Sequence, residues 1–180
     1  MANGTLKVSN IQTSSGSGTI TLGQSGETVN VSGTLGSRMG KILQVVETTV
    51  SGQVAFNSTT YTDYSGATLN ITPSTTSSKI QLDVKFSYYL DDNDGFSIKV
   101  IRTVGGSDTT VISYSSTYST IFYQVGAGQF YNFWSDTGTD SPSTTSQCTY
   151  KLQIASEGNR TIHIQPQGGN LVLRATEIGV

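Results

Sequence analysis

Histidine and cysteine, two residue types that often carry acid–base and nucleophilic chemistry, occur once each in this sequence of 180 residues. His163 lies between Ile162 and Ile164, so in a strand its side chain points away from the side that they occupy. A catalytic triad needs a histidine that a third group orients, and nothing nearby suggests that arrangement. Cys148 alternates with apolar residues, as a small buried hydrophobe does. The sequence therefore predicts no catalytic site, and one residue of each type makes a zinc site within one chain untenable.

An acidic run, Asp-Asp-Asn-Asp-Gly at residues 91–95, is the best candidate for a cation site. An EF-hand calcium loop needs glycine at its sixth position and glutamate at its twelfth. Counted from Asp91, the glycine is the fifth residue, and no glutamate stands at the twelfth. We interpret the run as a polar turn between two strands, with a weak calcium site as the alternative. The sequence thus predicts neither a metal nor a cofactor.

The densest aromatic cluster is Phe-Tyr-Asn-Phe-Trp at residues 130–134. Alternate residues of a strand point to opposite faces, so we expect some of these rings to fill the core and the others to face a neighbouring subunit. Exposed aromatic residues can also stack on sugars or anchor interfaces. Tyr131 and Trp134 are therefore the candidates for surface binding.

The elements that position these residues are strands. Good helix formers are sparse, charged residues make up only 12%, and 9 Tyr and 6 Phe accompany many Thr, Val and Ile. Short segments of alternating apolar residues are separated by turns rich in Gly, Ser and Pro, which is typical of a jelly-roll-like antiparallel β-sandwich. The expected strands lie at residues 42–47, 53–56, 68–72, 79–88, 96–100, 111–114, 120–125, 129–134, 148–154, 162–164 and 171–178.

Residues 1–39 have a different pattern, with isolated apolar pairs in short strand-like segments. Two apolar residues in a strand do not offset an ordering entropy of about 1–2 kcal/mol per residue, so one copy should not fold alone. Three copies around an axis could bury the pairs against one another. We predict an N-terminal β stem or attachment segment at 1–39 and a β-sandwich head at 40–180, with a flexible linker as the alternative for the first region. The predicted interface residues of the stem are Leu6, Val8, Ile20, Leu22, Val29 and Val31.

Several classes of protein are excluded by composition. A single cysteine forms no internal disulfide, so we expect folding without an oxidising compartment. The first ten residues are polar and predict no signal peptide, and no apolar run approaches the 18 residues or so that a membrane span needs. The 10 Lys and Arg are scattered, so we expect neither a membrane nor a nucleic acid as partner.

Three stretches of sequence are distinctive enough to compare with known families: Gly-Lys-Ile-Leu-Gln-Val-Val at 40–46, Ile-Thr-Pro-Ser-Thr-Thr-Ser-Ser-Lys-Ile at 71–80, and Ala-Thr-Glu-Ile-Gly-Val at 175–180. Together with the strand pattern between them, they resemble the β-sandwich head of small trimeric fibre and decoration (cement) proteins of tailed bacteriophages. The likeness covers most of residues 40–180. Its motifs are structural, so the resemblance transfers no active site.

The resemblance implies a non-enzymatic virion structural protein that assembles in the host cytoplasm as a homotrimer. The chain has room for a short stem and one head, which favours a capsid decoration or cement protein, or a short head spike, bound to virion proteins such as the major capsid protein. A tail fibre subunit and a receptor-binding module for a host surface glycan are the alternatives. A glycan-degrading enzyme would need paired carboxylates in a groove, and we expect none.

Overall fold

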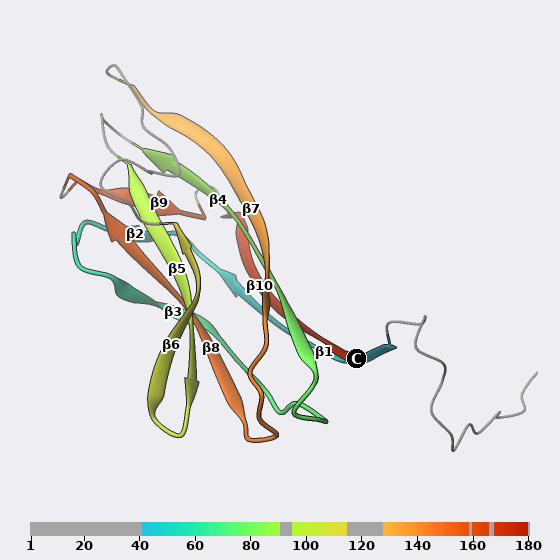
Figure 1. Cartoon of the computed structure of the whole chain (residues 1–180). Coiled ribbons are helices and arrows are strands. Elements are labelled where there is room, and N and C mark those ends of the chain that lie inside the picture. Colours follow the sequence, from blue (N-terminus) through green and yellow to red (C-terminus); the bar gives the residue numbers. More distant parts are fainter. Residues whose placement is uncertain (1–40, 91–94, 115–127, 159, 166–167, 180) are drawn as a thin grey trace, which may run out of the picture. The chain divides into compact units, whose positions relative to one another are not determined.

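The computed structural model describes residues 41–90, 95–114, 128–158, 160–165 and 168–179. These residues form ten strands and no α-helix, which confirms the predicted all-β class (Figure 1). The predicted stem residues, the acidic run at 91–94 and the expected strand at 120–125 lie outside the described residues. The strands are β1 (Lys41–Ser51), β2 (Val54–Phe56), β3 (Thr62–Ile71), β4 (Lys79–Leu90), β5 (Phe96–Val104), β6 (Ser107–Tyr114), β7 (Phe130–Asp140), β8 (Cys148–Ser156), β9 (Ile162–Ile164) and β10 (Asn170–Gly179).

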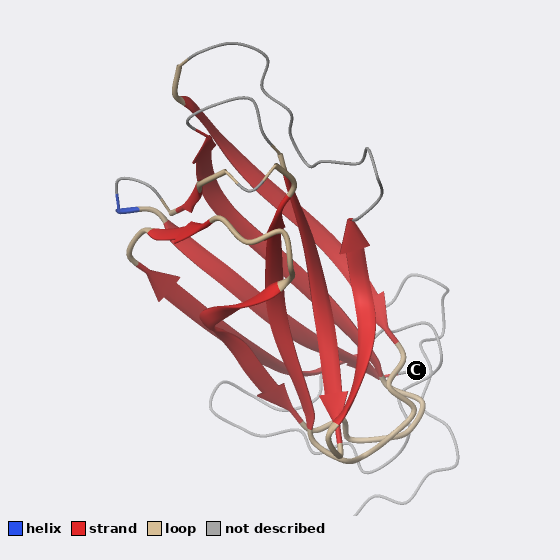
Figure 2. Cartoon of the chain, turned by 90° about the vertical axis from the view of Figure 1, so that its left-hand side faces the viewer, coloured by secondary structure: helices blue, strands red, loops and turns tan. Residues whose placement is uncertain are grey.

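The strands pack as two antiparallel sheets, one over the other (Figure 2). Sheet A has the order β1-β10-β4-β9-β2, with β7 on the other side of β4, and sheet B has the order β3-β8-β5-β6. Since β2 and β9 pair just beyond the ends of β1 and β10, these four strands form two interrupted columns. This gives eight columns, numbered in chain order: β1 with β2, then β3, β4, β5, β6, β7, β8, and finally β9 with β10. Sheet A then has the column order 1, 8, 3, 6, and sheet B has the column order 2, 7, 4, 5. This nested order is that of a jelly roll built from two Greek keys.

The core forms because apolar residues alternate along the central strands. In β4 every second residue from Ile80 to Leu90 is at most 2% exposed, and in β8 the same holds from Cys148 to Ile154. Burial of each large apolar side chain contributes about 1.5–3 kcal/mol. Phe86 and Tyr88 of β4 close around Phe96 of β5, with ring centroids 6.2 and 4.9 Å from it. The period-two pattern predicted for these strands is confirmed.

Gln165 joins the two halves of the column formed by β9 and β10. It is fully buried and has a φ of 61°, a conformation that interrupts the strand. Its N–H donates to the carbonyl of Ser87 at 2.8 Å, and its side-chain amide donates to the carbonyl of Val50. Tyr64, which an irregularity in β3 turns inward, donates its hydroxyl to Gln165 Oε1 at 2.5 Å. Burial raises the pKa of Tyr64 to about 12, so the phenol remains a donor at all ordinary pH values.

The sheets approach closely at one edge of the sandwich, where β6 lies beside β7. A Cβ atom on Gly138 would come within 2.6 Å of the Ile112 side chain, so only glycine fits between the two strands. The same edge is linked by an ion pair between Arg102 of β5 and Asp140 of β7. Sequence periodicity gave no sign of β7 beyond Trp134, although the strand continues to Asp140.

Candidate functional site

The outer face of sheet A carries a row of stacked rings. The strand register places His163 of β9 beside Tyr89 of β4, and Tyr89 beside Tyr131 of β7. The His163 and Tyr89 rings are nearly parallel, with centroids 4.2 Å apart and an interplanar angle of 2°. The Tyr89 and Tyr131 rings are stacked at 5.0 Å. Gln53 Nε2 lies 2.9 Å from His163 Nδ1, so the amide donates to a ring nitrogen that accepts. As predicted, His163 points away from the core.

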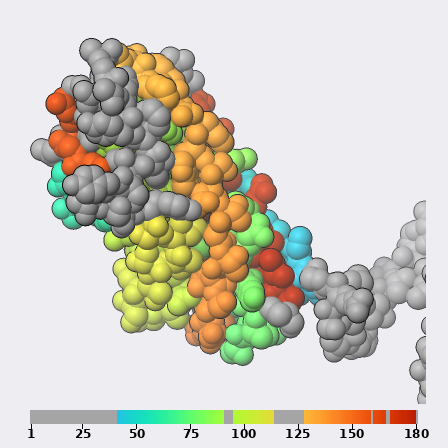
Figure 3. Space-filling model, turned by 45° about the horizontal axis from the view of Figure 1, so that its top comes forward, coloured from blue at the N-terminus to red at the C-terminus, as the bar shows by residue number. Residues whose placement is uncertain are grey.

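Two aromatic residues of β7 are exposed on this face. Tyr131 is 46% exposed and Phe133 is 58% exposed. Trp134 is half-buried and packs against the core, with its ring centroid 5.3 Å from that of Phe86. The alternation predicted for the cluster is therefore observed, although Phe133 was not among the residues chosen for surface binding. Binding at Tyr131 or Trp134 stays a prediction, and the geometry makes Tyr131 and Phe133 the pair that a ligand can reach. In Figure 3 the light-orange β7 is visible at the surface over much of its length.

The middle of the same face holds a shallow hollow of about 290 Å³ with a mixed polar and apolar lining. Two of its charged side chains are held by neighbours: Arg174 pairs with Glu47 at 2.5 Å, and Asp83 accepts a hydrogen bond from Thr137 at 2.7 Å. These pairs follow from the register, which places Glu47, Arg174, Asp83 and Thr137 in one row across four strands. The hollow offers polar contacts and contains no nucleophile–base pair. Its lining is Asp83, Val84, Lys85, Ser135, Thr137, Val172 and Arg174.

At the end of the head where β1 begins and β10 ends, Glu177 is fully buried and accepts four hydrogen bonds. Ser74 donates its N–H to Oε1 at 2.6 Å and its hydroxyl to Oε2 at 3.2 Å. Ser78 donates its hydroxyl to Oε1 at 2.7 Å, and Gln44 donates Nε2 to Oε2 at 2.5 Å. Burial alone would raise the pKa of Glu177, but the hydrogen bonds from Ser78, Gln44 and Ser74 outweigh it and lower the pKa below its ordinary value. The group is therefore a carboxylate near neutral pH.

The Glu177 cluster unites three distant parts of the chain. Gln44 lies in the stretch 40–46, Ser74 and Ser78 lie in the stretch 71–80, and Glu177 lies in the stretch 175–180. These are the stretches on which the resemblance to phage head domains rests. Sequence analysis did not identify their contact, since a polar loop and a strand separated by about a hundred positions leave no local pattern. A glutamate on the core-facing side of an apolar strand was the one available signal.

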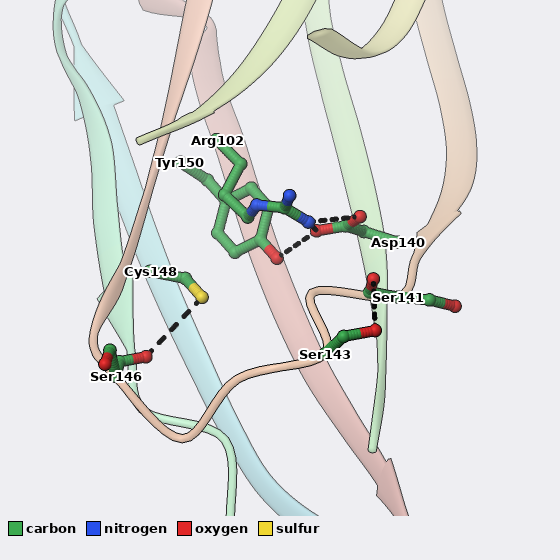
Figure 4. A network of polar contacts seen from close by, with 7 residues as sticks. All are labelled: Arg102, Asp140, Ser141, Ser143, Ser146, Cys148 and Tyr150. Atoms are coloured by element: carbon green, nitrogen blue, oxygen red, sulfur yellow. Dashed lines mark hydrogen bonds and ion pairs between the residues drawn. The ribbon is translucent and has the colours of Figure 1, made fainter. Parts of the chain in front are cut away.

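A second polar cluster closes the edge between the sheets (Figure 4). Arg102 donates Nη1 to both oxygens of Asp140 at 2.7 and 2.6 Å, and Tyr150 donates its hydroxyl to Asp140 at 2.7 Å. Burial lowers the pKa of the Arg102 guanidinium, but hydrogen bonding and attraction from Asp140 together raise it. Burial, followed by the bond to Asp140, raises the pKa of Tyr150 well above its ordinary value. The arrangement is a structural link between the sheets, because Arg102 of β5 and Tyr150 of β8 both donate to the same carboxylate of β7.

The described residues do not bring together a catalytic constellation. His163 lies in sheet A, whereas Cys148 lies in sheet B and is fully buried. Cys148 Sγ donates to the Ser146 carbonyl at 3.7 Å, and burial raises the pKa of the thiol, so the reactive thiolate is disfavoured. Within the described ranges, no group of three or more His, Cys, Asp or Glu side chains could hold a metal ion. The structure, as far as it describes the chain, contains no helix capable of spanning a bilayer.

Comparison with known proteins gives only distant similarity. No protein family model matches the sequence, and no curated protein matches it. The fold is similar to the VP2 capsid protein of infectious bursal disease virus in a subviral particle, with a TM-score of 0.37, 13% identity and coverage of 83% of this chain. A mutant VP2 from T=1 particles of the same virus gives a TM-score of 0.38 and 12% identity. This chain spans 44% of the length of either capsid chain. Scores of this size carry no argument about function.

Proposed function

We propose that this protein is a non-enzymatic structural component of a virion, a homotrimeric decoration or cement protein of a phage capsid or a short head spike. The observation that carries the proposal is the Glu177 cluster. The three stretches that resemble phage head domains meet at this one residue, where four hydrogen bonds fasten β1, the loop before β4 and β10 together.

The geometry of the head suits a projecting role. Lys41 pairs with Gly179, so the strand that begins the head and the strand that ends it lie side by side (Figure 1). A segment attached before β1 therefore joins the head beside the Glu177 cluster. In the proposal, residues 1–39 trimerise and contact a neighbouring virion protein such as the major capsid protein, and the jelly roll extends away from it.

The side chains of the head support binding rather than catalysis. The polar clusters at Glu177 and Asp140 have their oxygens occupied by hydrogen bonds from the protein. The thiol of Cys148 is buried with a raised pKa, and the histidine is stacked on Tyr89. A jelly roll is used by viral capsid and lectin domains alike, so the fold supports either a structural or a sugar-binding role by analogy alone.

Co-expression with the major capsid protein of the same genome tests the proposal. We expect the full chain to sediment with assembled capsid shells, and a chain lacking residues 1–39 to remain unbound. The matched control is the full chain mixed with shells of an unrelated phage. A full chain that stays at the top of the gradient in the presence of its own shells would refute the capsid role.

Glycan binding is the second candidate, favoured by the exposure of Tyr131 and Phe133 on one face of β7. Aromatic rings of this kind can stack on sugars. A glycan array with the full chain should show signals that are lost in Tyr131→Ala and retained in Thr137→Ala, since Thr137 lies on the same strand and face. An array with no signal for the unaltered chain would exclude this candidate and leave the structural role untouched.

A further inference from the structure

The hollow on the outer face of sheet A contains two groups of opposite charge that the described residues leave available. Asp83 accepts hydrogen bonds from Thr137 at 2.7 Å and from Gln81 at 3.3 Å, and both reach Oδ1. Its Oδ2 atom accepts no hydrogen bond from the described residues. Lys85 lines the same hollow, is exposed, and forms no ion pair within the described part of the chain. The hollow therefore presents one free acceptor and one free donor.

The charges of the hollow balance, which limits the ligands that it can accept. Arg174 is already neutralised by its ion pair with Glu47. Asp83 and Lys85 lie two residues apart on one face of β4, a separation of about 7 Å along the strand. A ligand that carries a net charge of either sign would therefore meet a like charge beside its counterion. A hydroxyl group both donates and accepts, so a neutral ligand with several hydroxyls satisfies both groups.

An exposed aromatic ring stands directly beside the hollow. The register pairs Phe133 with Ser87 and Ser135 with Lys85, so Phe133 is about 7 Å along β7 from the wall of the hollow. The Phe133 side chain is 58% exposed, and no described ring is stacked on it. Tyr131, by contrast, has one face of its ring covered by Tyr89. The ring of Phe133 can therefore cover the apolar C–H face of a sugar.

We propose that Phe133 and the hollow together bind a neutral saccharide, with the ring packed on the sugar and its hydroxyls bonded to Lys85 and to Asp83 Oδ2. The inference rests on the glycan candidate of the proposed function, and adds the polar half of that site and the charge class of the sugar. The hollow, at about 290 Å³, is near the lower limit of small-ligand sites, roughly 300 Å³, so it suits a short glycan. Thr137 already donates its hydroxyl to Asp83, so it is not a free donor for the sugar.

The class of ligand is tested by a glycan array probed with the full chain. The array should carry neutral hexose and N-acetylhexosamine oligosaccharides beside sialylated and uronic-acid oligosaccharides. We expect binding to neutral glycans, because Asp83 would repel the carboxylate of an acidic sugar. Binding confined to acidic glycans would overturn the inference.

The residues are tested by titrating the neutral array glycan that gives the strongest signal into full-chain variants. Lys85→Met removes the ammonium group and keeps an apolar stem, and Asp83→Asn keeps an oxygen that can accept from Thr137. We expect each to weaken binding about tenfold or more, the effect of losing a hydrogen bond to a charged group. Phe133→Ala should also weaken binding, whereas Phe133→Tyr, which keeps a ring, should not.

Lys79→Met is the matched control. Lys79 is an exposed lysine on the same strand and the same face, but it lies opposite Ile178, away from the hollow. Its replacement should leave the affinity unchanged. An unfolding temperature equal to that of the unaltered chain would show that a variant with lost binding has lost a contact and not its fold. Equal losses in Lys79→Met and Lys85→Met would contradict the site.

The outcomes separate this inference from the glycan candidate on which it rests. Binding of neutral glycans that is lost in Tyr131→Ala but unchanged in Lys85→Met and Asp83→Asn would overturn the inference and leave the glycan candidate standing. An unaltered chain that binds none of the array glycans would overturn both. Neither result bears on the structural role in the virion, which the capsid sedimentation experiment tests independently.

Discussion

The carboxylate of Glu177 is buried in a chain that has few charges, and neutral donors hold it in place. Two serine side chains, one backbone N–H and one glutamine amide supply its four hydrogen bonds. A buried charge costs several kcal/mol unless it is satisfied, so this arrangement persists only while all of the elements around it stay in position. The residue thereby makes the fold of the loop before β4 dependent on the ends of β1 and β10.

Replacement of Glu177 by glutamine should destabilise the head by about 1–3 kcal/mol at neutral pH, because the new NH₂ group would face donors where the carboxylate accepted. Chemical denaturation of the full chain measures the effect. Glu47→Gln is the matched control, since Glu47 is exposed on β1 and its pairing with Arg174 is a surface ion pair worth little. Equal losses in the two variants would contradict the importance assigned to the Glu177 cluster.

The same residue predicts acid sensitivity. The pKa of Glu177 is lowered in the folded protein from its ordinary value of 4.5. As the pH falls below that value, the unfolded chain takes up a proton before the folded one does. The stability that the carboxylate contributes is therefore complete above pH 4.5, declines as the pH falls through the lowered folded pKa, and is absent below it. In Glu177→Gln this part of the decline should disappear, which a comparison of unfolding free energies between pH 3 and pH 6 or so would reveal.

The contribution of Asp140 to stability differs from that of Glu177, because its partner Arg102 is itself charged. The side chains of Arg102 and Asp140 are only 15% and 11% exposed. Asp140→Ala would leave the guanidinium and the Tyr150 hydroxyl without their acceptor, and should cost about 3–5 kcal/mol. Arg102→Met combined with Asp140→Leu removes both charges and should cost less than Asp140→Ala alone. Chemical denaturation of the two variants measures the free energy of unfolding of each. A larger loss of stability in the double variant than in Asp140→Ala would contradict this account.

At the scale of the element, the edge between β6 and β7 depends on the absence of a side chain. Gly138→Ala would force a methyl group to within 2.6 Å of Ile112, so the strands would have to separate. We expect a loss of about 1–3 kcal/mol, the usual cost of overpacking. Thr139→Ala, at the next position and exposed, should change stability by less than about 0.5 kcal/mol. If Gly138→Ala combined with Ile112→Val restored part of the loss, the clash would be identified as its cause.

Strands with apolar alternation were predictable, and strands without it were not. The sequence pattern of β4 and β8 predicted both the strands and their buried faces. The part of β7 from Ser135 to Asp140 is polar on both faces and holds Gly138, and the first half of β3 contains an irregularity around Gly66. Pairing with β4 and β8, rather than any local preference, makes these segments strands. Tertiary context of this kind leaves no trace in a single strand.

The candidate site was predictable only in part, for a related reason. Exposure of Tyr131 follows from alternation once the strand is known. The stack on Tyr89 and His163 depends on the register of three strands that are far apart in the sequence. The Glu177 cluster depends on a loop and two strands from both ends of the head. The residue type at a single position indicates whether that position is buried or exposed. The contacts that it makes across the sheet can be predicted only when the strand order and register are known.

At the scale of the whole molecule, the described head contains a complete core of its own. The buried apolar residues come from both sheets and form one cluster within residues 56–175. The head should therefore fold without residues 1–39, which by themselves have too few apolar residues to fold as a single copy. If the full chain forms the proposed trimer, trimerisation and folding of the head should then be separate equilibria.

Thermal unfolding at several protein concentrations tests this separation. A protein stabilised by association unfolds at a temperature that rises with concentration, because mass action favours the assembled form. If the full chain is the proposed trimer, we expect that rise for the full chain and a constant unfolding temperature for the head alone, residues 40–180. A head whose unfolding temperature rises with concentration as strongly as that of the full chain would contradict the assignment, because association would then reside in the jelly roll itself and not in the stem.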